Sequence, residues 1–290
     1  MQTDPQTTAG AKYADLLMRL RAMGRVAVAF SGGVDSSLLL CAARDALGEN
    51  VLAVTAVSPL YYSVERKSAQ VIAAQLGVRH VLVDNPVLEH AAARHNPPDR
   101  CYHCKLWGFR AVQSAARSAG IEIVVEGSNV DDASDYRPGT RAITELSIHS
   151  PLRDAGLTKA EIRALAKAKG LANWDQPALA CLGSRFPYGE EMTPQRLARI
   201  EAGEAAVRAF GIRQVRVRDH GTIARIEVPP EAIATLAAVP VRAQLAARLR
   251  EIGYTYVALD LDGYRMGAMN AGVAQNRELN SSRTPEKGGS

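Results

Sequence analysis

The stretch Ser31-Gly32-Gly33-Val34-Asp35-Ser36 has the residue types of a phosphate-binding turn. Apolar runs on both sides, 26–30 and 38–43, predict that a strand enters this turn and a helix leaves it. Glycines allow close approach of the backbone, and the first N–H groups of a helix have no partner within it, so an anion binds well there. Serine hydroxyls add donors, and the Asp35 carboxylate can hold Mg²⁺. We therefore predict a nucleotide-phosphate site rather than a plain Gly-Gly turn.

Three of the four cysteines form a second group with chemical potential. Cys101 and Cys104 have the C-x-x-C spacing of metal ligands, and Cys181 stands in a loop, 171–195, that is rich in proline and glycine. Cys181 could act as a nucleophile, with Arg185 lowering its pKa. The alternatives are a Cys₃His zinc site that uses His103 or His95, free thiols, and a buried apolar role for Cys181.

The phosphate turn requires a parallel sheet to position it. Apolar periodicity predicts a helix over 11–24, a strand from 26, a helix to 47, a strand over 51–57, a helix over 64–76 and a strand over 80–83. Strands joined by helices in this βαβαβ order form an α/β fold with a parallel, doubly wound sheet. Further on, we expect a helix over 105–119, a strand over 121–126, and a capping box at Thr158 and Glu161 that begins another helix.

A second polar segment comes after the strand expected at 121–126. It contains Gly127, Ser128, Asn129 and Asp132. Carboxyl ends of parallel strands share one edge of the sheet, so we expect this segment beside the phosphate turn, at the nucleotide or its Mg²⁺. An ordinary polar turn is the alternative. Arg137, a little further on, is a candidate phosphate contact or an exposed loop residue.

The remaining chain predicts a smaller α+β domain. A helix over 194–210, strands over 215–218, 223–228 and 256–261, and a helical region over 232–252 come after the junction loop. We expect an ATP- or nucleotide-binding α/β domain over 1–180, this domain over 181–275 and a disordered tail over 276–290. Alternation places Arg216 and Arg218 on one strand face, where they could grip a phosphate with Glu204 and Glu227 orienting them, or form a solvated face.

Composition sets the remaining limits. The net charge of +5 suits phosphorylated substrates as well as RNA, and the 5% aromatic content argues against a nucleic-acid partner that needs stacking platforms. No apolar run reaches the roughly 18 residues of a membrane span and the start does not read as a secretory signal, so we expect a cytoplasmic protein without a membrane partner. Cys41 lies in an apolar helical run and should belong to the core.

Three segments together resemble a known family. Ser31–Ser36 resembles the SGGxDS loop of the PP-loop ATPases, which split ATP between the α- and β-phosphates. With Glu126–Asp132 and the stretch Cys181-Leu182-Gly183-Ser184-Arg185-Phe186-Pro187-Tyr188-Gly189, the chain resembles the LarE sulfur transferases of nickel-pincer nucleotide synthesis, over roughly residues 11–275.

That resemblance implies a reaction and a site. ATP with Mg²⁺ would adenylate a carboxylate of a pyridinium dicarboxylate mononucleotide, and sulfur would then replace oxygen. The family cysteine matching Cys181 either gives up its own sulfur or, with two more cysteines, ligates a [4Fe–4S] cluster, and this chain has Cys101 and Cys104 as well. The resemblance also implies that Ser184, Arg185, Arg216 and Arg218 hold the substrate and that the protein is a homo-oligomer.

Two other functions remain open from the sequence. A PP-loop tRNA thiolase also combines such a loop with cysteines and positive charge, and a nucleotide-sensing protein would bind ATP without splitting it.

Overall fold

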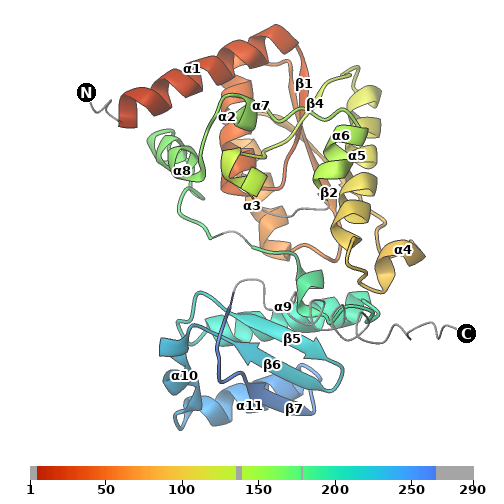
Figure 1. Ribbon diagram of the computed structural model, residues 1–290, viewed down its shortest axis with the longest axis vertical. Coiled ribbons are helices and arrows are strands. Elements are labelled where there is room, and N and C mark those ends of the chain that lie inside the picture. Colours follow the sequence, from red (N-terminus) through yellow and green to blue (C-terminus); the bar gives the residue numbers. More distant parts are fainter. Residues whose placement is uncertain (1–4, 135–138, 178, 266–290) are drawn as a thin grey trace, which may run out of the picture. The chain divides into compact units, whose positions relative to one another are not determined.

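The computed structural model describes residues 5–134, 139–177 and 179–265. The chain divides into two compact units, Met1–Cys181 (unit 1) and Leu182–Ser290 (unit 2), each with its own sheet (Figure 1). The tail at 276–290, for which we expected disorder, and Arg137 lie outside the described residues.

Unit 1 is built on a four-stranded, all-parallel sheet in the order β3-β2-β1-β4. Its elements, in chain order, are α1 (Pro5–Met23), β1 (Val26–Ala29), α2 (Val34–Leu47), β2 (Val51–Val57), α3 (Ser63–Gln75), β3 (Arg79–Asp84), α4 (Ala91–Arg94), α5 (Arg100–Ser118), β4 (Val124–Val125), the 3₁₀ helix Val130–Ser134, α6 (Thr140–Glu145), α7 (Pro151–Asp154) and α8 (Lys159–Ala168).

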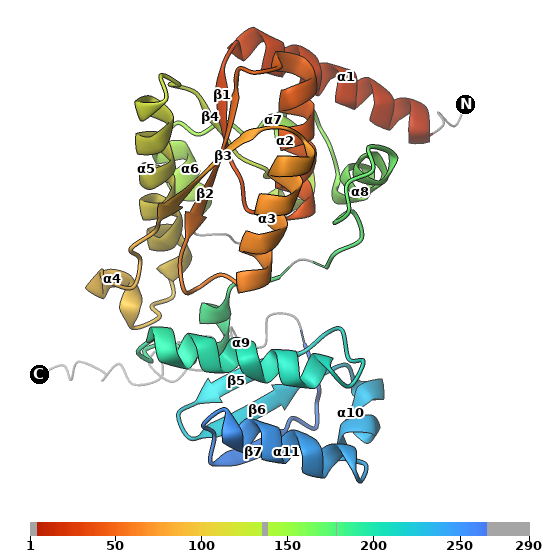
Figure 2. The same cartoon turned by 180° about the vertical axis from the view of Figure 1, so that it is seen from behind.

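Both faces of this sheet are covered, as the βαβ order requires. Val26 and Val28 of β1 pack with α1, α2, α3 and α8 in one core cluster. Ala27 of β1 and Leu52 and Val54 of β2 point to the opposite face and pack with α5 in another cluster. Figures 1 and 2 show α5 and α6 on one side of the strands and α1, α2 and α8 on the other. The predicted α/β fold with a parallel, doubly wound sheet is confirmed.

Two expected elements of unit 1 have different bounds in the structure. The helix expected from residue 105 begins at Arg100, so Cys101 and Cys104 lie in its first turns. The helix begins shortly after Pro97 and Pro98, whose rings disfavour helical geometry only for the residues that precede them. The strand expected over 121–126 is reduced to Val124–Val125, whose backbone pairs with β1 and, through an isolated bridge, with His149.

Unit 2 is a small α+β unit whose sheet has the order β5-β6-β7, antiparallel between β5 and β6 and parallel between β6 and β7. Its elements are the 3₁₀ helix Leu182–Arg185, α9 (Pro194–Arg208), β5 (Arg216–His220), β6 (Ile223–Glu227), α10 (Pro230–Ala237), α11 (Val241–Glu251) and β7 (Tyr256–Leu259).

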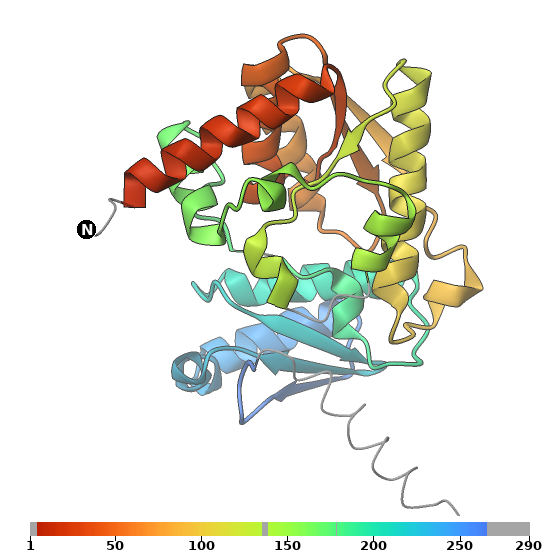
Figure 3. The ribbon, with the colours of Figure 1, turned by 45° about the horizontal axis from the view of Figure 1, so that its top comes forward.

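One face of this sheet is apolar and the other is charged. Val217 and Ile226 pack with residues of α9, α10 and α11 in a core cluster, and Figure 3 shows α9 and α11 behind the strands. The helical region expected over 232–252 is two helices, because Pro240 lacks an N–H and disfavours helical geometry at Val239.

No single helix among the described residues is long and apolar enough to cross a membrane, although α10 and α11, bent by 88° at their break, pass that test together by length and composition.

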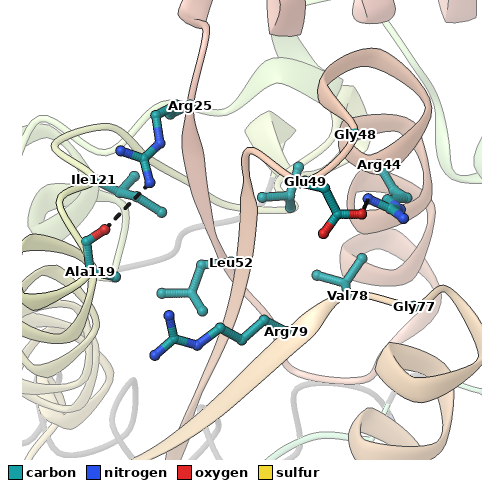
Figure 4. A pocket seen from close by; sticks show the side chains of 11 residues that line it. Arg25, Arg44, Gly48, Glu49, Leu52, Gly77, Val78, Arg79, Ala119 and Ile121 are labelled. Carbon is teal, nitrogen blue, oxygen red and sulfur yellow. Dashed lines mark hydrogen bonds and ion pairs between the residues drawn. The ribbon is translucent and has the colours of Figure 1, made fainter.

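A cavity of about 140 Å³ lies at the amino ends of the strands of unit 1. Arg25, Arg44 and Arg79 line it together with apolar side chains such as Leu52 and Ile121 (Figure 4). Arg44 is paired with Glu49, and Arg25 donates to the Gly120 carbonyl at 3.1 Å. Because the phosphate turn comes after the carboxyl end of β1, this cavity lies at the opposite edge of the sheet from the nucleotide loops.

The capping box at the start of α8 is formed as predicted. The Thr158 hydroxyl accepts from the Glu161 N–H at 3.3 Å, and the Glu161 carboxylate accepts from the Thr158 N–H at 2.8 Å.

We expect Thr158→Ala to lower the free energy of unfolding by about 1 kcal/mol, because the first turn of α8 loses its capping hydroxyl and the Glu161 N–H loses its partner. Urea denaturation measures this change. Thr144→Ala is the matched control, since Thr144 is exposed on α6 and its hydroxyl contacts a carbonyl of its own helix. Equal effects of the two substitutions would contradict the prediction.

Candidate active site

The turn Ser31–Ser36 is held by a backbone contact that only glycine permits. Gly32 has a φ of +80°, and a Cβ there would lie 2.7 Å from the Glu65 carbonyl and 2.8 Å from the Ala69 nitrogen, both on α3. Hydrogen bonds inside the turn also stabilise it. The Ser31 and Ser36 hydroxyls lie 3.1 Å apart, and the Ser36 hydroxyl donates to the Gly33 carbonyl at 3.0 Å.

Helix α2 begins within this turn, at Val34. Its N-cap residue is Gly33, in extended conformation, which has no side chain to cap the helix. The first N–H groups of a fourteen-residue helix therefore point toward the turn together with the positive end of the helix dipole. This geometry favours a phosphate group at the turn.

The second polar segment lies against the first, as expected. A Cβ on Gly127 would lie 3.0 Å from the Ser36 nitrogen, so these two backbones touch. Buried Glu126 holds the segment in place, because its carboxylate accepts from the Ser128 N–H at 3.1 Å, the Ser128 hydroxyl at 2.8 Å and the Ser150 hydroxyl at 2.5 Å.

Asn129 and Asp132 stabilise the turn at the end of this segment. The Asn129 N–H donates to Asp132 Oδ2 at 3.0 Å, and buried Asn129 Oδ1 accepts from the Asp131 N–H at 2.9 Å. In this structure the two side chains therefore shape the loop, and their contact with a nucleotide or Mg²⁺ stays a prediction.

Two residues that contact the predicted phosphate turn from other segments were not predicted from the sequence. Asn173, buried, donates to the Gly32 carbonyl at 2.8 Å and to the Ser37 hydroxyl at 3.0 Å. Lys159, the first residue of α8, places its ammonium 2.5 Å from Asp35 Oδ2. The sequence signal for Asn173 was its place in the irregular loop 171–195, and the signal for Lys159 was its position next to the Thr158 cap.

The three cysteines gather around one buried arginine. Arg100 Nη2 lies 3.5 Å from Cys181 Sγ and 3.7 Å from Cys101 Sγ, and its Nη1 donates to Asn96 Oδ1. Burial alone would lower the pKa of the Arg100 guanidinium, but the charges of Cys181 and Cys101 hold that pKa above its usual value. Arg100 is thus a cation at the cysteines that the sequence, which suggested Arg185, did not reveal.

Cys104 differs from the other two thiols in its surroundings. It is buried, while Cys101 is exposed and Cys181 is half-buried. Its sulfur lies 3.1 Å from the Tyr61 hydroxyl, and its carbonyl accepts from Asn85 at 3.1 Å. Burial raises the pKa of the Cys104 thiol to about 11 against the opposing effect of the Tyr61 hydrogen bond. Cys41 is buried in the core of unit 1, as expected.

The donor set partly fits the predicted metal. Three thiols near one guanidinium match the ligand number of a [4Fe–4S] cluster with one open iron, and the Arg100 cation would offset part of the charge of thiolates bound to such a cluster. Across the described residues, however, no three His, Cys, Asp or Glu side chains are placed so that they could hold a metal ion. Cys101 and Cys181 instead contact Arg100 and Cys104 contacts Tyr61. The three side chains therefore do not form the metal site expected from their spacing and would have to turn to bind a cluster.

Unit 2 brings together five of the six predicted substrate residues. Arg218, buried, donates to Glu227 at 2.9 and 2.6 Å and to the Ser184 carbonyl at 2.6 Å. Arg185, fully buried, donates to Glu204 at 2.8 Å and to the Ser184 hydroxyl at 2.7 Å.

The sixth residue, Arg216, shares the charged face of β5 with Arg218. Its guanidinium donates to the Val215 carbonyl and lies 5.1 Å from the ring centre of Tyr264. Arg225, which the sequence reasoning missed, faces Arg218 across the β5–β6 ladder and pairs with Glu227 at 3.0 Å and Asp260 at 2.7 Å. The face is therefore rich in arginine, with carboxylates that fix two of the guanidinium groups.

Several known proteins are similar to this chain in sequence. The family described as asparagine synthase matches residues 16–109. A protein of Lactiplantibacillus plantarum, named pyridinium-3,5-bisthiocarboxylic acid mononucleotide synthase, is 39% identical over 267 residues, which cover 91% of this chain and 95% of the relative. The chain belongs to the LarE family of PP-loop ATPases. A Synechocystis sp. protein named only as uncharacterized is 41% identical over 248 residues, 86% of this chain and 92% of the relative.

Membership of the LarE family supports ATP use by a PP-loop ATPase domain. The predicted PP loop of that domain is Ser31–Ser36, which lies within the matched residues. In this family member the loop depends on one backbone contact at Gly32, on the Asn173 amide and on the neighbouring Gly127 segment.

We expect Gly32→Ala to destabilise unit 1 by more than about 1 kcal/mol and to abolish ATP use, because alanine disfavours the positive φ and its methyl meets the backbone of α3. Gly33→Ala is the control: Gly33 has a φ of −77°, and a Cβ there meets only the Ser31 hydroxyl at 3.4 Å. Urea unfolding and pyrophosphate release measure both variants. Similar results for the two would show that the contact at Gly32 does not shape the loop.

Proposed function

We propose that this protein is an ATP-dependent sulfurtransferase that converts carboxylates of a pyridinium dicarboxylate mononucleotide into thiocarboxylates. The observation that carries the proposal is that Cys101 and Cys181 both contact Arg100, with Cys104 in the same turns of α5, in the unit that contains the predicted PP loop of a LarE-family chain. The relative of known name, a pyridinium-3,5-bisthiocarboxylic acid mononucleotide synthase, supports the substrate class.

The first chemical step activates the acceptor. A carboxylate is a poor electrophile, because its charge repels nucleophiles and oxide is a poor leaving group. Its oxygen attacks the α-phosphorus of ATP and pyrophosphate leaves, which gives an acyl-adenylate. The N–H groups at the start of α2 and the hydroxyls of Ser31 and Ser36 stabilise the charge on the departing pyrophosphate.

Mg²⁺ would be held at Asp35. The carboxylate is in the first turn of α2, and its Oδ1 is buried without a hydrogen-bond partner among the described residues, so an oxygen ligand is ready for a hard cation. When bound, Mg²⁺ would neutralise phosphate charge.

The second step delivers sulfur. A sulfur nucleophile attacks the acyl carbon and AMP leaves, so that the carbon–oxygen bond to AMP is exchanged for a carbon–sulfur bond. We propose that Cys101, Cys104 and Cys181 hold a [4Fe–4S] cluster, which would carry the sulfur to be transferred, and that Arg100 hydrogen-bonds the thiolates of Cys101 and Cys181.

A sacrificial Cys181 is the second version of this step. Its thiolate would attack the acyl-adenylate, AMP would leave, and loss of the Cα proton would cleave the Cβ–S bond to give the thiocarboxylate and dehydroalanine. The contact of Arg100 Nη2 with Cys181 Sγ places a cation beside the attacking sulfur in this version as well.

Substrate binding is proposed for unit 2. Ser184, Arg216 and Arg218 would provide donors for the phosphate of the mononucleotide, and the fully buried Arg185 would position Ser184. Glu204 and Glu227 fix Arg185 and Arg218.

Cysteine variants test the sulfur step separately from activation. We expect Cys101→Ser, Cys104→Ser and Cys181→Ser to release pyrophosphate with the carboxylate substrate but to form no thiocarboxylate, because the first step uses only the PP loop and AMP leaves only when sulfur attacks. Cys41→Ala is the control and should keep both steps, since Cys41 belongs to the core of unit 1. Full thiocarboxylate yield from the three serine variants would overturn the proposal.

Iron content and protein mass separate the two versions of the sulfur step. Anaerobic reconstitution with iron and sulfide should give about four irons per chain in the cluster version, and each serine variant should lose iron. Colourless protein with stoichiometric zinc would overturn that version. The sacrificial version instead predicts that one turnover lowers the mass of Cys181 by about 34 Da, the mass of one sulfur and two hydrogen atoms, as the residue becomes dehydroalanine.

A further inference from the structure

The ion pair between Lys159 and Asp35 joins the start of α8 to the PP loop. Lys159 Nζ lies 2.5 Å from Asp35 Oδ2, and the two side chains are 30% and 24% exposed. The backbone of Lys159 is fixed, because its N–H donates to Asp131 Oδ2 at 2.8 Å and the preceding Thr158 caps α8. The lysine is thus held at the PP loop by the second loop segment.

Only one of the two carboxylate oxygens of Asp35, Oδ2, takes part in this ion pair. Its Oδ1 is buried and has no hydrogen-bond partner within the described ranges of the chain. A buried carboxylate oxygen without a partner is unfavourable, and at the N-terminus of a helix that binds phosphate it indicates a place for a cation. The oxygen donor and its place next to the phosphate site fit Mg²⁺.

Lys159 and Mg²⁺ would therefore compete for one carboxylate. An ammonium group and a divalent cation on the same aspartate repel each other unless an anion lies between them. The phosphates of ATP bring several negative charges to this turn, and they offer the ammonium a new partner within reach of the α2 N-terminus.

We propose that Lys159 neutralises Asp35 while the nucleotide site is empty and moves to a phosphate oxygen of ATP when Mg²⁺ takes the carboxylate. Lys159 is then an ATP-binding residue that couples the metal to the nucleotide. In the free enzyme it weakens metal binding, and in the complex it strengthens nucleotide binding. By linkage, the nucleotide must tighten metal binding by the same factor by which the metal tightens nucleotide binding.

Metal and nucleotide binding test this exchange without any sulfur chemistry. The probes are Mn²⁺, followed by electron paramagnetic resonance, and the α,β-methylene analogue of ATP, followed by calorimetry. Lys159→Gln should bind Mn²⁺ alone about tenfold more tightly than the natural chain, because the competing cation is gone, and should bind the analogue with Mn²⁺ about tenfold more weakly.

Lys12→Gln is the matched control. Lys12 also pairs with a carboxylate at the start of α8, but its partner is Glu161, at 2.8 Å, rather than Asp35, so both affinities should stay at the values of the natural chain. Lys159→Arg keeps the charge and should retain weak binding of Mn²⁺ alone. Unchanged Mn²⁺ and nucleotide affinities in Lys159→Gln would show a static ion pair and overturn the proposal.

Lysine acetylation of the natural chain provides a readout that needs no variant. Mn²⁺ alone should increase the acetylation rate of Lys159, because it displaces the ammonium from Asp35, and adding the nucleotide analogue should then protect Lys159. Lys12 should react at a constant rate throughout. A Lys159 rate that does not respond to Mn²⁺ and the analogue would overturn the exchange, whereas the sulfur-transfer proposal would stand, since it depends on the cysteines.

Discussion

The backbone contact at Gly32 is the constraint on which the nucleotide loops depend. The loop turns with a positive φ against the backbone of α3, and the carbonyl of Gly32 then faces the buried amide of Asn173. Gly127 brings the second loop against the Ser36 backbone. Main-chain groups packed this closely leave no room for side chains at Gly32 and Gly127. Because the N-cap Gly33 has no capping side chain, the N–H groups at the start of α2 are available to an anion.

Each predicted functional site has its own pairing of charged or polarisable side chains. Asp35 is paired with Lys159, the cysteines surround Arg100, and the fully buried Arg185 is paired with Glu204. Removal of one partner from a buried pair such as Arg185 and Glu204 costs about 3–5 kcal/mol, because a charge is left without compensation. Groups of this kind fix side-chain positions before a substrate arrives, and this is the condition that electrostatic catalysis requires.

The sequence predicted the α/β unit well because its signals are local. Apolar strands and amphipathic helices repeat over short distances, and the capping box at Thr158 needs only four residues. Predictions failed where a boundary depended on partners outside the segment itself. The first turns of α5, which begins at Arg100, include Cys104, which contacts Tyr61 and Asn85. The strand β4 is limited to Val124–Val125, which pair with β1 and bridge to His149.

The sequence by itself determined the PP loop, the family and the identity of the three thiols, because glycine, serine and cysteine have chemical properties that do not depend on the fold. Only the tertiary structure decided which basic side chain lies beside the cysteines and which lies beside Asp35. Arg100 lies at the cysteines, where among the described residues no metal-binding group is formed, and Lys159, 124 residues from Asp35, lies at the PP loop. Lys159 and Asp35, like Arg100 and Cys181, are distant in sequence, so no spacing rule reveals these pairs, and only the packing of α8 and α5 brings them together.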